Sequence, residues 1–300
     1  MKKNISLIGV PMDLGQTRRG VDMGPSAIRY AGIIERLENL QYTVHDLGNV
    51  NIPRPDRHEI EREDKLRNLL EVVEANTSLA DIVNEQVRKK HFPLVLGGDH
   101  SIAIGSIAGV SRQYEDLGVI WYDAHGDINT TETSPSGNIH GMPLAVSLGY
   151  GHEKLTNILF EQPKIKPENV VLIGIRDLDE GEKERLRKLN IKVYTMHEID
   201  RLGMPQVMGE TISYLKKRTD GVHLSFDLDG IDPSEAPGVG TPVRGGVTYR
   251  ESHLALEMLA EADIITSAEF VEVNPMLDDK NQTADLTVAL IGSLLGEKLI

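Results

Sequence analysis

The chain has 300 residues, of which 40% are hydrophobic and 26% charged, and its formal net charge is −14. It contains no cysteine, which excludes disulfides, thiolate zinc sites and a cysteine nucleophile. The negative charge argues against nucleic acid or an anionic membrane as a partner, and no apolar run is long enough to cross a bilayer, so we expect a cytoplasmic protein.

Eight short segments are strand-like, and several of them are continuous Val, Ile and Leu runs, as expected when helices cover both faces of a sheet. The first of them is too short to be a signal peptide and leads into a proline, so it too is predicted to be a strand. The predicted strands are Ile5–Val10, Tyr42–Asp46, Pro93–Leu96, Val119–Asp123, Val170–Ile175, Lys192–Thr195, Val222–Asp227 and Ile264–Val273.

Helical patterns fill most of the intervals between these strands. The predicted helices are Pro25–Leu40, Asp64–Lys90, Ser101–Tyr114, Gly181–Leu189, Pro205–Lys217, Tyr249–Ala262 and Ala284–Leu299. Strands that alternate with helices favour parallel βαβ construction, in which helices cover both faces of the sheet. We find no repeat or linker, so we expect residues 1–300 to form a single doubly wound α/β domain.

Potential metal ligands follow three of the predicted strands. Asp123, His125 and Asp127 occupy every second position after one strand, a spacing that points their side chains to the same side of an extended backbone. His100 follows a second strand in the segment GGDHS. Asp227 and a further aspartate two residues on, Asp229, follow a third.

Together these residues supply four carboxylates and two imidazoles. Any one cluster would suit a polar loop or a helix cap, but parallel strands bring their carboxyl ends to one edge of a sheet. Four negative charges balance two divalent cations. Oxygen-rich ligation with some histidine favours Mn²⁺, with Mg²⁺, Fe²⁺ or Co²⁺ possible and zinc less suitable. Two ions roughly 3.5–4 Å apart would lower the pKa of a shared water.

Two further features of the sequence bear on function. The segments Asn129–Asn138 and Leu228–Thr248 are long, rich in Gly, Pro, Ser and Thr, and follow strands, where open α/β sheets bind ligands. His140 closely follows the first of them. His223, by contrast, lies inside a predicted strand and is expected to be a hydrogen-bonded core histidine.

These motifs resemble those of the ureohydrolase superfamily and, within it, the arginase family. The matching segments are GGDHS at 97–101, DAHGD at 123–127 and SFDLDGIDP at 225–233. The likeness extends from GVPMD at 9–13 and GVDMGP at 20–25 to EFVEVNP at 269–275, so it covers essentially the whole chain. It implies a three-layer α/β/α fold with a parallel eight-stranded sheet, as in arginases and related deacetylases, and two Mn²⁺ per subunit.

The resemblance also implies a ligand set and a reaction. One ion would be held by His100, Asp123, Asp127 and Asp227, and the other by Asp123, His125, Asp227 and Asp229. The family reaction is hydrolysis of a guanidinium, here of L-arginine to L-ornithine and urea, by attack of a metal-bridging hydroxide. In it, Asp127 would hold the proton of the hydroxide, His140 would protonate the leaving amine, and Glu272 would bind the guanidinium, with a further contact from Thr241.

The same resemblance assigns the groups that would distinguish arginine from smaller guanidines. Asn129, Ser134, Ser136 and Asn138 would contact the α-carboxylate, and Asp179 the α-amino group. Ser134 departs from the threonine that is common in animal members but keeps the hydroxyl. These residue types are equally common in any turn, which is the alternative explanation of the segment.

Other functions fit the sequence as well. An agmatinase or another guanidino-acid ureohydrolase would use the same chemistry, and a non-catalytic metal-binding regulatory protein could use the same fold. For the arginase hypothesis, the resemblance further implies a role in arginine metabolism and the urea cycle and a homo-oligomer, usually a homohexamer.

Overall fold

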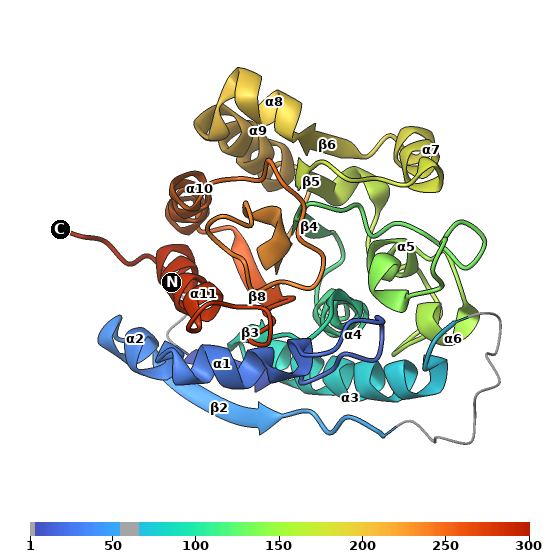
Figure 1. The fold of residues 1–300 in the computed structure, drawn as a ribbon, viewed down its shortest axis with the longest axis horizontal. Helices are drawn as coiled ribbons and strands as arrows, with labels where there is room; N and C mark the ends of the chain where they lie inside the picture. Colours follow the sequence, from blue (N-terminus) through green and yellow to red (C-terminus); the bar gives the residue numbers. More distant parts are fainter. Residues whose placement is uncertain (1–3, 55–65) are drawn as a thin grey trace.

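The computed structural model describes residues 4–54 and 66–300. Eight parallel strands form one sheet in the order β2-β1-β3-β8-β7-β4-β5-β6, with helices on both faces, which confirms the predicted three-layer α/β/α fold (Figure 1). The strands are β1 (Asn4–Gly9), β2 (Thr43–Asn49), β3 (Phe92–Leu96), β4 (Leu117–Tyr122), β5 (Val170–Ile175), β6 (Lys192–Thr195), β7 (Gly221–Asp227) and β8 (Ile265–Val271).

The α-helices vary in length from 4 to 20 residues. They are α1 (Gly24–Tyr30), α2 (Ile33–Asn39), α3 (Leu69–Arg88), α4 (Ala103–Ser111), α5 (Pro143–Ser147), α6 (Glu153–Thr156), α7 (Glu180–Leu189), α8 (Met196–Leu202), α9 (Met204–Lys216), α10 (Tyr249–Ala262) and α11 (Gln282–Leu294). Short 3₁₀ helices are η1 (Val21–Met23), η3 (His100–Ile102), η4 (Ile139–Gly141), η5 (Pro167–Asn169) and η6 (Leu228–Gly230). Helices α5, α6 and α8 were not predicted, because helices of only four to seven residues are too short to show a helical repeat of apolar residues.

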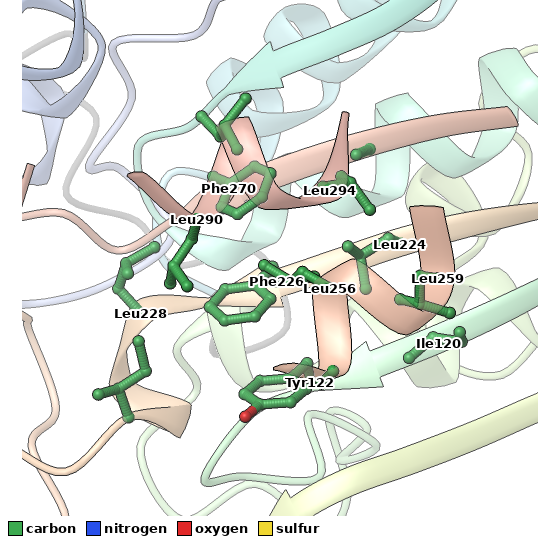
Figure 2. Close-up of a cluster of buried hydrophobic side chains, with 14 of the residues drawn as sticks. Ile120, Tyr122, Leu224, Phe226, Leu228, Leu256, Leu259, Phe270, Leu290 and Leu294 are labelled. Atoms are coloured by element: carbon green, nitrogen blue, oxygen red, sulfur yellow. The ribbon is translucent and has the colours of Figure 1, made fainter. Parts of the chain in front are cut away.

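Two hydrophobic cores lie on opposite faces of the sheet. Neighbouring residues of β4 alternate between them, so that Tyr122 packs in one core and Trp121 in the other. In the first core, Tyr122, Phe226 and Phe270 come from the adjacent strands β4, β7 and β8, and their rings stack with centroids 4.4 and 5.2 Å apart (Figure 2). Burying each such side chain stabilises the fold by about 1.5–3 kcal/mol.

The single helix predicted over Pro25–Leu40 is wrong, because the chain forms α1 and α2 instead. The break falls at Gly32, whose φ of 87° lies in the left-handed region. Glycine adopts that conformation without a steric penalty, and it ends the right-handed helix there.

Two other helices lack several predicted residues at one end. Asp64, the predicted start of one, lies outside the described residues, and α3 begins after Asn68, which has a φ of 51°. The helix predicted over Ala284–Leu299 ends at Leu294, shortly before Gly296 with a φ of 88°. In both cases a left-handed residue, rather than a change in hydrophobic pattern, sets the boundary.

The sheet order brings the candidate residues together. Strands β3, β8, β7 and β4 are consecutive neighbours in the sheet although they are far apart in the sequence. His100 follows β3, Glu272 follows β8, Asp227 ends β7 and Asp123 follows β4. Since all four strands run in the same direction, these residues meet at one edge. Within the described ranges, no helix is both long and apolar enough to cross a membrane.

Candidate metal centre

His100 is the point at which three strand ends converge. Its Nδ1 lies 3.0 Å from a carboxylate oxygen of each of Asp123, Asp127 and Asp227. The ring is 1% exposed and stacks on Trp121 with centroids 4.2 Å apart and an interplanar angle of 7°. One ring nitrogen carries at most one hydrogen, so it cannot satisfy three carboxylates at once.

His125 forms a second group beside the first and shares a carboxylate with it. Its Nδ1 lies 3.3 Å from Oδ1 of Asp123 and 3.1 Å from Oδ2 of Asp229. Two sets of side chains are thus close enough to hold one ion each, the first His100, Asp123 and Asp227, the second Asp123, His125 and Asp229. Asp123 belongs to both, so two ions would lie next to each other.

The carboxylates of the centre are held in place by surrounding hydrogen-bond donors. Asp123 accepts hydrogen bonds from Nε1 of Trp121 at 3.0 Å and from the backbone N–H of His125 at 2.6 Å. Asp229 accepts a hydrogen bond from the hydroxyl of Thr241 at 2.9 Å. Thr241 therefore contacts a ligand of the centre, a role that the sequence did not predict for it.

The electrostatics of the centre favour a bound cation. Burial and the negative charge of Asp123 raise the pKa of Asp127 to about 6, and burial and the charge of Asp229 raise the pKa of Asp227 well above its ordinary value. Burial alone would lower the pKa of His100, but the close approach of the three carboxylates raises it instead. These carboxylates repel one another at close range, and dications between them would remove that repulsion.

The donor set and an unpartnered atom both fit such ions. Among the residues that the structure describes, Nδ1 of His100 is a buried polar atom without a hydrogen-bond partner of good geometry, although three carboxylates surround it. Carboxylates with two imidazoles form the hard, oxygen-rich set that suits manganese. The six residues proposed from the sequence as ligands therefore lie where they could bind two cations.

Two residues of this region have backbone conformations that are unusual for their type. Asp127 has a φ of 48° and Glu272 a φ of 66°, both in the left-handed region that side chains disfavour. Glu272 follows β8 and is 1% exposed. Such conformations persist where surrounding contacts hold them, and they are frequent at functional sites.

Glu272 lies behind His140. Its Oε1 accepts a hydrogen bond from the backbone N–H of His100 at 2.9 Å and is 3.5 Å from Nδ1 of His140, and its Oε2 accepts one from Nε2 of Gln16 at 3.1 Å. Burial opposes charge on the imidazole, but the contact with Glu272 raises the pKa of His140 above its ordinary value. The backbone N–H of His140 also donates to the carbonyl of Gly15.

A cavity of about 150 Å³ opens beside the metal ligands. Its lining includes nearly all the residues proposed from the sequence as ligands or substrate contacts, together with Pro135, Gly141 and Glu182. Glu272 and Asp123 are not part of the lining, and both are buried. The lining residues are His100, His125, Asp127, Asn129, Ser134, Pro135, Ser136, Asn138, His140, Gly141, Asp179, Glu182, Asp227, Asp229 and Thr241.

The far wall of the cavity carries the predicted substrate loop. Nδ2 of Asn129 donates to Oδ2 of Asp179 at 2.9 Å. Within the described part of the chain, the amide oxygens of Asn129 and Asn138 are buried and have no partner. The hydroxyls of Ser134 and Ser136 accept hydrogen bonds from the backbone of their own turn. Both amides thus have hydrogen-bonding capacity left for a polar ligand.

Asp179 has a second task that the sequence did not assign. It is the N-cap of α7, and its side chain forms a capping box with Glu182. Burial raises the pKa of Glu182 to about 7. Glu182 is thus an acid in the first turn of α7, and the capping box also fixes Asp179 at the cavity wall.

Sequence reasoning missed several residues that support the site. Gln16 contacts Glu272, and the guanidinium of Arg176 donates to the backbone carbonyls of Asp229, Gly230 and Val243. No motif or spacing marks either residue, because each acts between distant segments. The contact of Trp121 with Asp123 could have been expected, since the two residues share a strand face.

Comparison with known proteins identifies relatives along the whole chain. The model of the Arginase family matches residues 3–296. The chain is 70% identical to the arginase of Bacillus caldovelox over 298 residues, which is 99% of this chain and 100% of that one. It is 65% identical to the arginase of Bacillus subtilis, with both chains covered completely.

Solved structures give the same result in three dimensions. The arginase of Bacillus caldovelox superposes with a TM-score of 0.97 over 99% of this chain and 100% of that one. The arginase of Entamoeba histolytica, solved in complex with L-ornithine, is 34% identical and superposes with a TM-score of 0.91 over 99% of both chains.

Proposed function

The chain belongs to the arginase family and is a hydrolase, and we propose that it converts L-arginine and water to L-ornithine and urea with two manganese ions per subunit. The observation that carries the proposal is the convergence of three carboxylates on the buried Nδ1 of His100. The complex of the Entamoeba histolytica arginase with L-ornithine supports the choice of product.

The six ligands would be divided between the two ions. His100, Asp123, Asp127 and Asp227 would hold one ion, and Asp123, His125, Asp227 and Asp229 the other. When bound, such a pair supplies a water of lowered pKa as the nucleophile. It also offsets the negative charge on the oxygen that this water brings to the guanidinium carbon.

Side chains around the cavity would manage the protons. Asp127 lies at the cavity wall, where its carboxylate can take the proton of the attacking water. His140 faces the same cavity with 18% of its side chain exposed, and its raised pKa favours the protonated form that a general acid needs. We therefore assign protonation of the leaving ornithine amine to His140.

Glu272 would bind the guanidinium of the substrate. Its pKa is lowered, because hydrogen bonding and charge attraction from His140 outweigh the effect of burial, so the carboxylate stays ionised. A charged carboxylate beside the cavity can make charge-assisted hydrogen bonds to guanidinium N–H groups. Because Glu272 is not in the cavity lining, we expect the guanidinium to reach it by displacing the His140 ring from its contact.

The loop that follows β4 would select arginine. Asn129, Ser134, Ser136 and Asn138 offer neutral polar groups for an α-carboxylate, and Asp179 offers a negative charge for the α-amino group. The buried amide oxygens of Asn129 and Asn138 have no partner within residues 4–54 and 66–300 and can accept a hydrogen bond from the α-ammonium group or from a water that bridges to the α-carboxylate. A buried amide left without a partner costs free energy that a bound ligand would recover.

An agmatinase would share the metal ligands but would have no use for the α-carboxylate contacts. A non-catalytic metal-binding protein would have no use for His140 and Glu272, which are not ligands yet are paired at the cavity. Both alternatives thus leave polar groups of this site without a purpose.

Assays with L-arginine and agmatine, run side by side on the manganese-loaded protein, test the substrate. We expect kcat/KM to be larger for arginine. Replacing Asn138 with Ala should raise KM for arginine about 10-fold or more, by loss of a hydrogen bond to a charged group, and leave that for agmatine nearly unchanged. A preference of the unmodified protein for agmatine would contradict the assignment. The homohexamer and the cytoplasmic location stay predictions.

A further inference from the structure

A chain of hydrogen bonds leads from His100 away from the cavity and into the sheet. Nε2 of His100 lies 2.7 Å from the hydroxyl of Ser225, and that hydroxyl donates to Oε1 of Glu269 at 2.8 Å. Ser106 donates to the other oxygen of Glu269. Ser225 and Glu269 are partners on the adjacent strands β7 and β8, and both are 0% exposed.

Glu269 is a buried carboxylate that the proposed chemistry does not use. The oxygen that accepts from Ser225, Oε1, is also 3.4 Å from Nε2 of His223. Nδ1 of His223 is in turn 2.9 Å from the hydroxyl of Ser267, in agreement with a hydrogen-bonded core histidine. Burying a carboxylate costs free energy unless its contacts offset the loss of hydration. The function of Glu269 therefore lies in the contacts that it makes.

The direction of the hydrogen bonds follows from the chemistry of the groups. An ionised carboxylate only accepts hydrogen bonds, so the single proton of the Ser225 hydroxyl points at Glu269. Towards His100 the hydroxyl can then only accept, which requires a proton on Nε2 of that ring. A neutral His100 therefore has its lone pair on Nδ1, the atom that faces Asp123, Asp127 and Asp227.

The stacking of His100 on Trp121 does not by itself determine which ring nitrogen faces the carboxylates. The nearly parallel contact with Trp121 fixes the plane of the His100 ring. A flat stack is preserved, however, when an imidazole turns over or changes its tautomer. The hydrogen bond to Ser225 is what distinguishes the two nitrogens.

We propose that Glu269 is a positioning residue that acts through Ser225 to hold His100 in the tautomer and orientation in which Nδ1 is free to bind a metal ion. Glu269 thereby controls how tightly the ion beside His100 is retained. The inference rests on the proposed metal centre and not on the identity of the substrate. Residues that orient a ligating histidine typically change metal affinity by about 10–100-fold.

Two substitutions interrupt the series of hydrogen bonds from His100 to Glu269 at different points. Glu269→Gln keeps the size of the side chain but can offer an N–H to Ser225, so the direction of the hydroxyl is no longer fixed. Ser225→Ala removes the hydroxyl and leaves Glu269 with its bond from Ser106. The matched control is Ser106→Ala, which also removes a buried serine hydroxyl from Glu269 but does not contact His100.

The test is manganese binding by full-length protein that has first been stripped of metal. Mn²⁺ is titrated into the unmodified protein and the three variants, and bound ions per chain are counted at each free concentration. Electron paramagnetic resonance at each step distinguishes coupled Mn²⁺ pairs from single ions. Circular dichroism verifies that each variant is folded.

We expect two ions and a coupled spectrum for the unmodified chain and for Ser106→Ala. Glu269→Gln and Ser225→Ala should bind one of the two ions about 10–100-fold more weakly and give the spectrum of single ions at intermediate concentrations. If Glu269→Gln unfolds, Ser225→Ala carries the test alone.

The inference is overturned if the folded Ser225 variant retains both ions as tightly as the unmodified chain. It is also overturned if Ser106→Ala loses metal to the same extent, because the network would then have only a general structural effect. An unmodified chain that binds no manganese would overturn the proposed function together with this inference, whereas two ions in every variant would overturn this inference alone.

Discussion

His140 has the position and the charge of an acid, and it does not bind the metal in our assignment. Replacing it with Asn keeps a polar group of similar size but removes the transferable proton. We expect kcat for arginine to fall about 10²–10⁴-fold while the protein still binds two manganese ions per chain. Steady-state kinetics together with metal analysis of the same sample check this.

The metal analysis separates this role from a structural one. A variant that lost manganese along with activity would show that His140 supports the centre rather than donating a proton. A variant that kept full kcat would contradict the assignment outright.

The residue scale is also where sequence reasoning was most complete. The spacing of Asp123, His125 and Asp127 placed three candidate ligands on one side of a strand end, and the structure brings all three to the same centre. Gln16 could not be found in this way. Its contact with Glu272 joins positions that are 256 residues apart in the sequence. Gln16 lies in a loop without any periodic pattern, so nothing in the local sequence predicts the contact.

At the scale of single elements, the turn before η3 depends on a close approach of two backbone segments. A methyl group on Gly98 would lie 2.0 Å from the carbonyl oxygen of Met12, so one segment would have to move. We expect Gly98→Ala to lower the free energy of unfolding by about 1–3 kcal/mol and to weaken metal binding, since His100 follows this turn.

Gly209 provides the matched control. It lies in α9, and a methyl group there would meet nothing within 4 Å. Gly209→Ala should be neutral or stabilising by up to about 1 kcal/mol, because alanine favours helix. Urea unfolding of both variants makes the comparison, and equal effects would contradict the argument from close approach.

The loop after η6 depends on one carboxylate. Asp232 accepts hydrogen bonds from the backbone and hydroxyl of Ser234 and from the backbone of Gly245 and Gly246. Burial would raise its pKa, but these hydrogen bonds lower it to about 2. The carboxylate therefore stabilises the fold above its ordinary pKa, and this contribution is lost as the pH falls towards 2.

Asp232→Asn should therefore cost on the order of 1 kcal/mol at pH 7, allowing for screening by solvent. Urea unfolding of metal-free protein from pH 7 to pH 3 measures the difference between variant and unmodified chain. We expect a constant difference above about pH 5 and a smaller one below about pH 4. A difference that grew on acidification would have the wrong sign.

The boundaries of elements were harder to predict than their existence. All eight predicted strands are present, and those that are continuous apolar runs, such as β3, β4 and β5, are buried along their whole length. Helix ends depended instead on single left-handed residues such as Gly32 and Asn68. Whether such a residue adopts that conformation is decided by packing around it, which the local sequence does not contain.

At the scale of the whole molecule, the order of the strands creates the site. The last strand, β8, lies between β3 and β7, so segments that are far apart in the sequence are neighbours in the sheet. We propose on this basis that residues 1–300 work as one domain. Parallel pairing could be predicted from the alternation of strands and helices. The strand order was not predicted, because it depends on contacts between distant parts of the chain.

Metal removal should affect the whole molecule, since the repelling carboxylates come from strands at the centre of the sheet. A ligand present at 100 times its Kd stabilises the folded state by about 2.7 kcal/mol. We therefore expect saturating Mn²⁺ to raise the melting temperature of the stripped protein. An unchanged melting temperature in the presence of manganese would contradict metal binding by the folded state.

Urea release from L-arginine by metal-stripped protein, measured with and without added Mn²⁺ and with a parallel count of bound ions, tests the central claim most directly. We predict almost no urea before addition and restored activity as the second ion binds to each chain. Two bound manganese ions without urea release, or full activity in the thoroughly stripped protein, would contradict it.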